Sequence, residues 1–152
     1  MDENMVKITI PLPEDNLAGA ATESVWASPQ EGNTYQIKNV PFYAKGISCE
    51  DLVDAEPLEN ALMFKRVVRH NGHSTYRIYA KSTRQSPEVM KVLKSLENMH
   101  CEMEPATDKL VGVDVLPEAD IYAVYQVLDD AERNGILDFQ EGHCGHRLRS
   151  TQ

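Results

Sequence analysis

Residues 70–80, HNGHSTYRIYA, separate two parts of the chain that have different hydrophobic patterns. Before this stretch, apolar and polar residues alternate over short segments, and no segment shows a helical period. After it, short alternating segments are interrupted by two longer segments in which apolar residues recur at helical spacing. This change of period predicts a β-rich part followed by a part that contains both strands and helices.

The N-terminal part contains five predicted strands, separated by clusters of turn-forming residues. The predicted strands are residues 6–10, 23–27, 34–38, 52–55 and 61–69. Short strands at close spacing, without a helix, predict a small β-barrel or a curled antiparallel sheet over residues 1–71. Trp26, Phe42 and Phe64 are expected to form its core.

The C-terminal part, residues 72–152, has the predicted order strand, helix, strand, strand, helix, strand. The first helix is expected to begin at Pro87, after Ser86 as its N-cap, and the second to end before residues 134–135, Asn-Gly. This order is typical of the ferredoxin-like βαββαβ sandwich. Right-handed crossovers then place the third strand between the first and second, and the first strand between the third and the last. The chain is therefore expected to be an α+β protein in two parts.

Four of the five histidines lie in the two segments that this arrangement brings together. The first strand of the C-terminal part begins beside the end of the last strand, so His70 and His73 are expected near His143, Cys144 and His146. Imidazole and thiolate groups are ligands of zinc and other borderline metals. The alternative is a polar patch in which the histidines donate hydrogen bonds to backbone carbonyls. We favour the alternative because neither segment has the spacing of a known zinc signature.

Asp51 and Arg77 are two further candidate anchors, for a ligand or for the structure itself. Asp51 is expected to accept hydrogen bonds from backbone amides in a turn. Arg77 is expected on the face of its strand opposite Tyr76 and Ile78. There it either pairs with Asp114 on the neighbouring strand or binds an anionic ligand.

Four short motifs resemble those of a family of short bacterial proteins known only as a domain of unknown function. The motifs are Glu23-x-x-Trp26-Ala27, Asn39-x-Pro41-Phe42, Gly46-x-Ser48-x-x-Asp51-x-Val53 and Gly72-His73-Ser74-Thr75-x-Arg77. The resemblance implies a bacterial, cytoplasmic protein, and it assigns no catalytic residue.

The charge balance and the cysteines restrict the partners and the compartment. Fifteen Lys and Arg residues against 24 Asp and Glu residues give a net charge of -9, which repels nucleic-acid backbones. No run of 18 apolar residues occurs, so no membrane span is expected. Three widely spaced cysteines are a poor disulfide framework and favour the reducing cytoplasm.

These properties favour a non-enzymatic protein-binding module of the immunity or antitoxin type, which covers a basic partner. A solvated surface carries similar acidic residues, so the charge alone does not identify the partner. The alternative is an enzyme that depends on a metal ion, with zinc as the candidate, or that binds a small molecule at the histidine end of the sheet. Ser74 and Cys144 have histidines nearby, but no Gly-x-Ser-x-Gly elbow is present. The sequence leaves the oligomeric state open.

Overall fold

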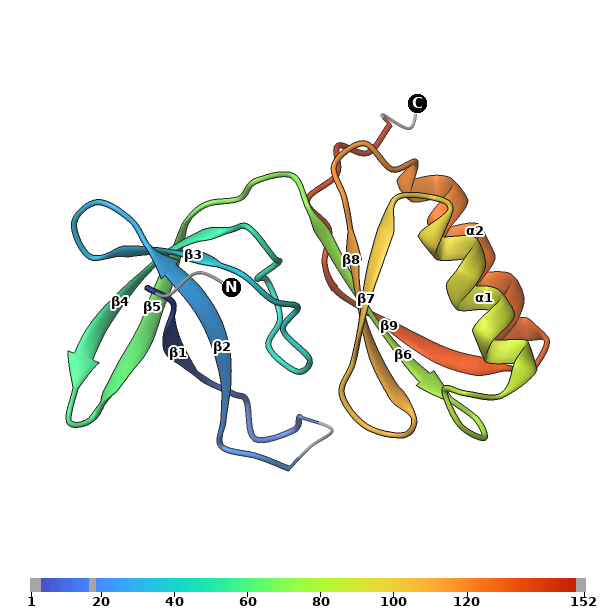
Figure 1. The fold of residues 1–152 in the computed structure, drawn as a ribbon, viewed down its shortest axis with the longest axis horizontal. Coiled ribbons are helices and arrows are strands. Elements are labelled where there is room, and N and C mark those ends of the chain that lie inside the picture. Colours follow the sequence, from blue (N-terminus) through green and yellow to red (C-terminus); the bar gives the residue numbers. More distant parts are fainter. Residues whose placement is uncertain (1–3, 17–18, 150–152) are drawn as a thin grey trace.

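The computed structural model describes residues 4–16 and 19–149, and its two parts lie side by side (Figure 1). The first five strands form a closed barrel, and the last four form a sheet with two helices. In chain order the elements are β1 (Val6–Pro11), β2 (Thr22–Pro29), β3 (Thr34–Ile37), β4 (Leu52–Leu58), β5 (Ala61–Arg69), β6 (Ser74–Ala80), α1 (Pro87–Glu97), β7 (Cys101–Pro105), β8 (Leu110–Val115), α2 (Ile121–Arg133) and β9 (Leu137–His143). The expected α+β class is therefore confirmed.

The barrel is an antiparallel meander that closes on itself. Each of its strands pairs antiparallel with the next, and a short parallel pairing between β1 and β5 completes the ring. Because successive side chains of a strand point to opposite faces, one set of apolar residues fills the interior. The buried core includes Ile8, Val25, Ala27, Ile37 and Val53.

Trp26 does not belong to this core, and the expectation that it does was wrong. Its neighbours Val25 and Ala27 point inward, so the alternation places the indole outside, with 45% of the residue exposed. The ammonium group of Lys7 lies 5.1 Å from the centroid of the indole ring. Phe64 does pack against the barrel core.

The second part is a sheet of order β7-β8-β6-β9 in which all neighbouring strands are antiparallel. This is the strand order that the order of elements predicts. Both helices cover one face of the sheet (Figure 1). The Ser86 hydroxyl accepts the Val89 N–H at the start of α1, and the Asp120 carboxylate accepts the amides of Tyr122 and Ala123 at the start of α2.

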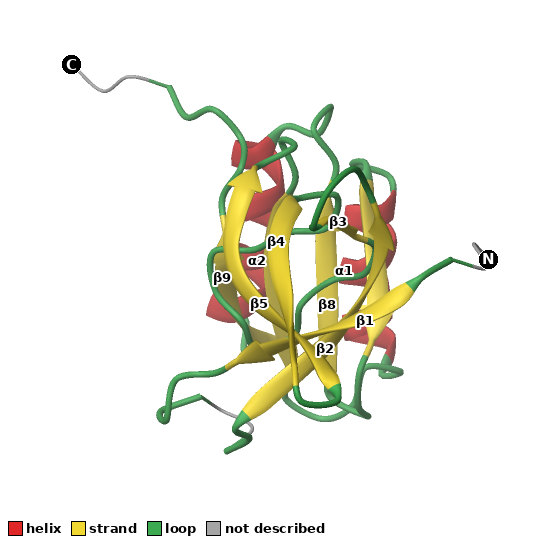
Figure 2. Ribbon diagram, turned by 90° about the vertical axis from the view of Figure 1, so that its left-hand side faces the viewer, coloured by secondary structure: helices red, strands yellow, loops and turns green. Residues whose placement is uncertain are grey.

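The segment between β3 and β4, residues 38–51, joins the two parts, and we call it the junction loop. It packs on the face of the sheet opposite the helices, so the barrel lies in front of the sheet in Figure 2. Gly46 N–H donates to the Gly142 carbonyl at 2.9 Å, and the hydroxyls of Ser48 and Thr75 are 2.6 Å apart. We expected Phe42 in the barrel core, and this expectation was wrong. Phe42 lies in the junction loop and packs against Gly112 of β8. Strand β6 is consequently buried on both faces.

Among the described residues, no helix combines the length and apolar character that crossing a membrane requires.

Candidate functional site at the junction of barrel and sheet

The histidine-bearing segments meet at one end of the sheet, because β6 and β9 run antiparallel. Thr75 of β6 is paired with His143, the last residue of β9. His70 and His73 lie just before β6, and Cys144 and His146 lie just after β9. The topology thus brings the two segments together, but their side chains divide into three separate arrangements.

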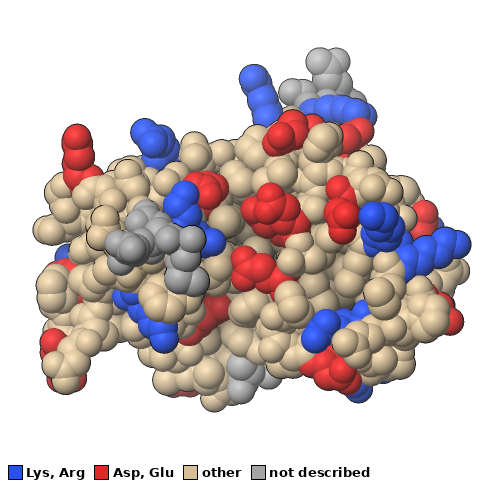
Figure 3. All heavy atoms as spheres, viewed as in Figure 1, with Lys and Arg blue, Asp and Glu red and all other residues tan. Residues whose placement is uncertain are grey.

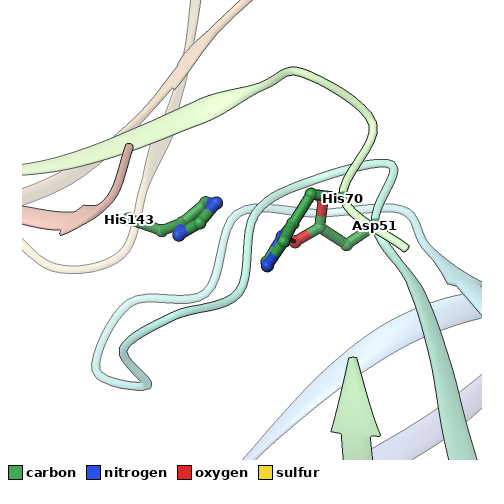
Figure 4. Close-up of side chains that lie close together, drawn as sticks. All are labelled: Asp51, His70 and His143. Atoms are coloured by element: carbon green, nitrogen blue, oxygen red, sulfur yellow. Dashed lines mark hydrogen bonds and ion pairs between the residues drawn. The ribbon is translucent and has the colours of Figure 1, made fainter. Parts of the chain in front are cut away.

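The first arrangement joins Asp51, His70 and His143 across the junction (Figure 4). The Asp51 carboxylate is fully buried and accepts hydrogen bonds from the amides of Ser48, at 2.9 Å, and Asn71, at 3.2 Å. This confirms the expected turn-capping role of Asp51. Its Oδ2 atom is also 2.8 Å from Nδ1 of His70.

The ring of His143 stacks on the ring of His70, with centroids 4.2 Å apart and an interplanar angle of 19°. Nε2 of His143 is buried and has no hydrogen-bond partner among the described residues. Burial and the neighbouring His70 lower the pKa of His143, which favours its neutral form. A neutral imidazole with an unpartnered buried nitrogen has a lone pair or an N–H that remains unsatisfied.

The second arrangement is a buried pair of His73 and Asp114. Nδ1 of His73 is 2.7 Å from an Asp114 carboxylate oxygen, and 8% of His73 is exposed. The hydrogen bond to Asp114 raises the pKa of His73, although burial acts in the opposite direction. Asp114 therefore pairs with His73, so the alternative in which Arg77 pairs with Asp114 was wrong.

The third arrangement is a network of Ser74 and His146. Nε2 of His146 donates to the Leu116 carbonyl at 2.8 Å, so Nδ1 accepts the hydroxyl hydrogen of Ser74 at 2.6 Å. The Ser74 oxygen accepts the N–H groups of Gly145 and His146. His146 thus bonds to a backbone carbonyl, as the polar-patch alternative describes. Cys144 donates weakly to the His146 carbonyl, at 3.6 Å.

Arg77 anchors the junction loop to the sheet. Its guanidinium is completely buried, Nε donates to the Phe42 carbonyl at 2.8 Å, and Nη2 donates to the Ala44 carbonyl. Nη1 has no hydrogen-bond partner among the described residues. Burial lowers the pKa of Arg77, and the negative charge of Glu23 opposes this effect. Arg77 therefore connects the barrel part to the sheet.

Glu23 completes this anchor, and sequence reasoning assigned it no role. Its carboxylate accepts the N–H groups of Phe42, Tyr43 and Ala44. The carbonyls of Phe42 and Ala44 in turn accept hydrogen bonds from Arg77. The signal was present in the sequence, because Glu23 has the same strand parity as the buried residues Val25 and Ala27. An acid at an inward position indicates a buried polar contact.

A cavity of about 240 Å³ lies at the other end of β6. It is lined partly by Tyr43, Lys45, Tyr79 and Gln140. Tyr79 is near the end of β6, whereas the histidines gather at its beginning, so the cavity does not include them. The histidine arrangements are positioned at a packed junction, not inside this cavity.

The fold defines a class of two-part α+β protein, in which a closed barrel lies against one face of a four-stranded sheet. The buried side chains of Arg77 and Glu23 hold the two parts together. The chain belongs to the family described as Domain of unknown function (DUF4265), whose model matches residues 23–139. The resemblance seen in the sequence is therefore confirmed.

A solved structure, described as "Novel crystal structure of a hypothetical protein from Neisseria gonorrhoeae", has the same fold. The two structures superpose with a TM-score of 0.81, the sequences are 18% identical, and the match covers 95% of this chain and 99% of that chain. The comparison with curated proteins found no match.

Proposed function

We propose that this protein is a non-enzymatic binding module that covers a basic surface of a protein partner, as immunity proteins and antitoxins do. The observation that carries the proposal is a group of acidic side chains in the middle of one face (Figure 3). Figure 1 shows β7 and the junction loop in this region. The proposal also assigns the C-terminal part to the ferredoxin-like architecture, on the basis of its strand order and its two helices.

We call Glu50, Glu102 and Glu104 the acidic face, because the charges of Glu50 and Glu104 both act on Cys49 and the charge of Glu102 acts on Glu104. Glu104 accepts the N–H of Val40 at 3.0 Å. Burial raises the pKa of Glu104, the hydrogen bond from Val40 opposes this effect, and the nearby charges of Asp114 and Glu102 raise the pKa further. Glu102 is exposed on β7. Unlike Glu50, which forms an ion pair with Lys38 at 2.9 Å, Glu102 has no salt bridge among the described residues.

Such a face attracts a basic partner and accelerates its association, particularly at low salt. The partner class is a basic protein, in agreement with the net charge of -9 and with the repulsion of nucleic acid. Edge strands often carry charged residues to prevent unwanted pairing, so the test must separate a specific role of Glu102 from general charge.

The test uses the immobilised protein to capture partners from a lysate of its native host at low salt. Wild type is compared with Glu102→Lys and with the control Glu118→Lys, an equal charge change at an exposed position outside the acidic face. We expect wild type and the control to retain the same basic protein, and Glu102→Lys to retain about 10-fold less of it. Equal retention by all three, or no retained basic protein, contradicts the proposal. Co-expression with the captured protein then tests whether it is toxic and neutralised.

A second candidate function is an enzyme that uses a metal ion or a small molecule at the histidine end of the sheet. The convergence of Asp51, His70 and His143 favours it. Ser74 is buried and its hydroxyl is engaged with His146, so this candidate relies on the carboxylate of Asp51 and the two imidazoles. Capture of one stable basic partner whose affinity does not change with added metal favours the binding module over this enzyme.

A further inference from the structure

Three side chains with metal-ligating atoms come together from three separate segments of the chain. Asp51 ends the junction loop, His70 follows β5, and His143 ends β9. One carboxylate oxygen and one ring nitrogen from each histidine all lie within 4.8 Å of one another. Figure 4 shows the three side chains turned toward one another at the junction.

We propose that Asp51, His70 and His143 bind one divalent transition-metal ion, which links the barrel to the sheet. Two imidazoles and one carboxylate are a ligand set that zinc and ferrous iron use in proteins. The proposal does not depend on the binding of a protein partner, because it rests on side chains outside the acidic face.

Asp51 and His70 are spaced as two neighbouring ligands of one ion. Oδ2 of Asp51 and Nδ1 of His70 are 2.8 Å apart, and a hydrogen of His70 lies between them. Two ligand atoms about 2.0–2.2 Å from a tetrahedral zinc ion are roughly 3.3–3.6 Å apart, so the two atoms move apart by about half an ångström when the ion enters. The ion takes the place of this hydrogen: the proton moves through solvent to Nε2 of the same ring, and Nδ1 binds the ion with its lone pair.

His143 supplies the third ligand. It also provides a second, separate observation that points to a ligand, because one of its ring nitrogens lacks a hydrogen-bond partner in the part of the chain that the structure describes. Its Nε2 atom is buried without a hydrogen-bond partner among the described residues, which is an unfavourable arrangement for a polar atom. The His143 and His70 rings are 19° from parallel, so ligation of one ion requires His143 to turn about its Cβ–Cγ bond. Loss of the stacking is therefore an expected consequence of binding.

The surroundings of the three ligands suit a cation. The backbone amides of Ser48 and Asn71 hold the Asp51 carboxylate in place, as outer hydrogen bonds do in metal sites. The negatively charged carboxylate of Glu141 is close enough to His143 to act on its pKa in the upward direction. The side chain of His70 is 44% exposed, which gives an ion access from solvent.

The test is a zinc titration of chelator-treated, untagged protein by calorimetry, compared with His70→Ala, His143→Ala and His100→Asn. His100 is exposed and outside the site, and its positive φ of 65° suits asparagine, so His100→Asn is the matched control. We expect one zinc ion per chain for wild type and the control, and at least about 10-fold weaker binding for the other two variants. Unchanged affinity in either alanine variant overturns the proposal.

A second measurement on wild type keeps the proposal testable if a variant does not fold. Nuclear magnetic resonance of the histidine rings during the same titration is expected to shift the signals of His70 and His143 first, with those of His73 and His100 unchanged. Signals that shift at other histidines instead, or no shift at about 1 mM zinc, overturn the proposal.

Discussion

The Nη1 atom of Arg77 occupies the space that a Cβ atom on Gly142 would fill. The other two guanidinium nitrogens of Arg77 donate to carbonyls of the junction loop. Because Gly142 has no side chain, the guanidinium lies between β9 and the loop with both contacts intact. The absence of a side chain at Gly142 in the sheet thus allows Arg77 to hold the junction loop of the barrel part.

Gly142→Ala is expected to displace Arg77 and to lower the free energy of unfolding by about 1–3 kcal/mol, as overpacking of a filled interior does. Chemical denaturation measures the change. Glu141→Ala, at an exposed neighbouring position on β9, is the control and should change stability by less than about 0.5 kcal/mol. Equal stability of the two variants contradicts the assigned role of Gly142.

Glu23→Gln is expected to weaken the same anchor from the opposite side of the junction loop. The substitution removes the negative charge that accepts three backbone N–H groups, and it adds an amide group that cannot accept from them. We expect a loss of about 2–3 kcal/mol of unfolding free energy. Glu102→Gln, at an exposed carboxylate, is the control. A loss no larger than that of the control would show that the three amides find other acceptors.

The sequence predicted the secondary structure and the strand order better than the side-chain contacts at the junction of barrel and sheet. Alternating residues predicted the five barrel strands, and Ser86 with Pro87 predicted the start of α1, because strand parity and helix capping are local properties. The strand order of the sheet followed from the handedness of crossovers. The division of the chain at residues 71–72 stays a prediction.

The partners of the site residues depend on contacts between distant segments, and spacing alone does not determine those contacts. Arg77 donates to carbonyls of the junction loop because that loop lies on the face of β6 opposite the helices. No periodic pattern in the sequence predicts which residues of a loop contact which residues on the face of a sheet. For the same reason, convergence of the histidines was predictable, but their division among Asp51, Asp114 and Ser74 was not.

The His73–Asp114 pair should make stability depend on pH. The folded pKa of His73 is raised by its hydrogen bond to Asp114, with Glu50 and Asp51 contributing in the same direction. A raised folded pKa gives stability that is fully present below the unfolded pKa of about 6.5 and is lost as pH rises through the folded value.

His73→Gln removes this titration, because glutamine stays neutral. The difference in unfolding free energy between wild type and His73→Gln should be larger at about pH 5.5 than at about pH 9. Denaturant titrations at the two pH values measure it. A difference that is constant with pH, or larger at high pH, contradicts the assignment of the charged form to the folded pair.

The three cysteines should differ sharply in reactivity toward a thiol reagent. Cys49 and Cys101 are buried, and burial raises the pKa of Cys49 and raises the pKa of Cys101 to about 12. Since the thiolate is the reactive form, both groups are protected twice, by low access and by low ionisation. Cys144 is only partly buried. We expect a disulfide reagent at about pH 8 to modify one thiol per folded chain, and three after denaturation.

Two variants identify the thiol that reacts in the folded chain. Cys144→Ser should abolish the reaction of the folded chain, while Cys101→Ser should leave it unchanged. Rapid modification of a second thiol without denaturant would show that the junction opens at Cys49 or that the helices separate from the sheet at Cys101, and mass mapping of the modified residue distinguishes these two cases.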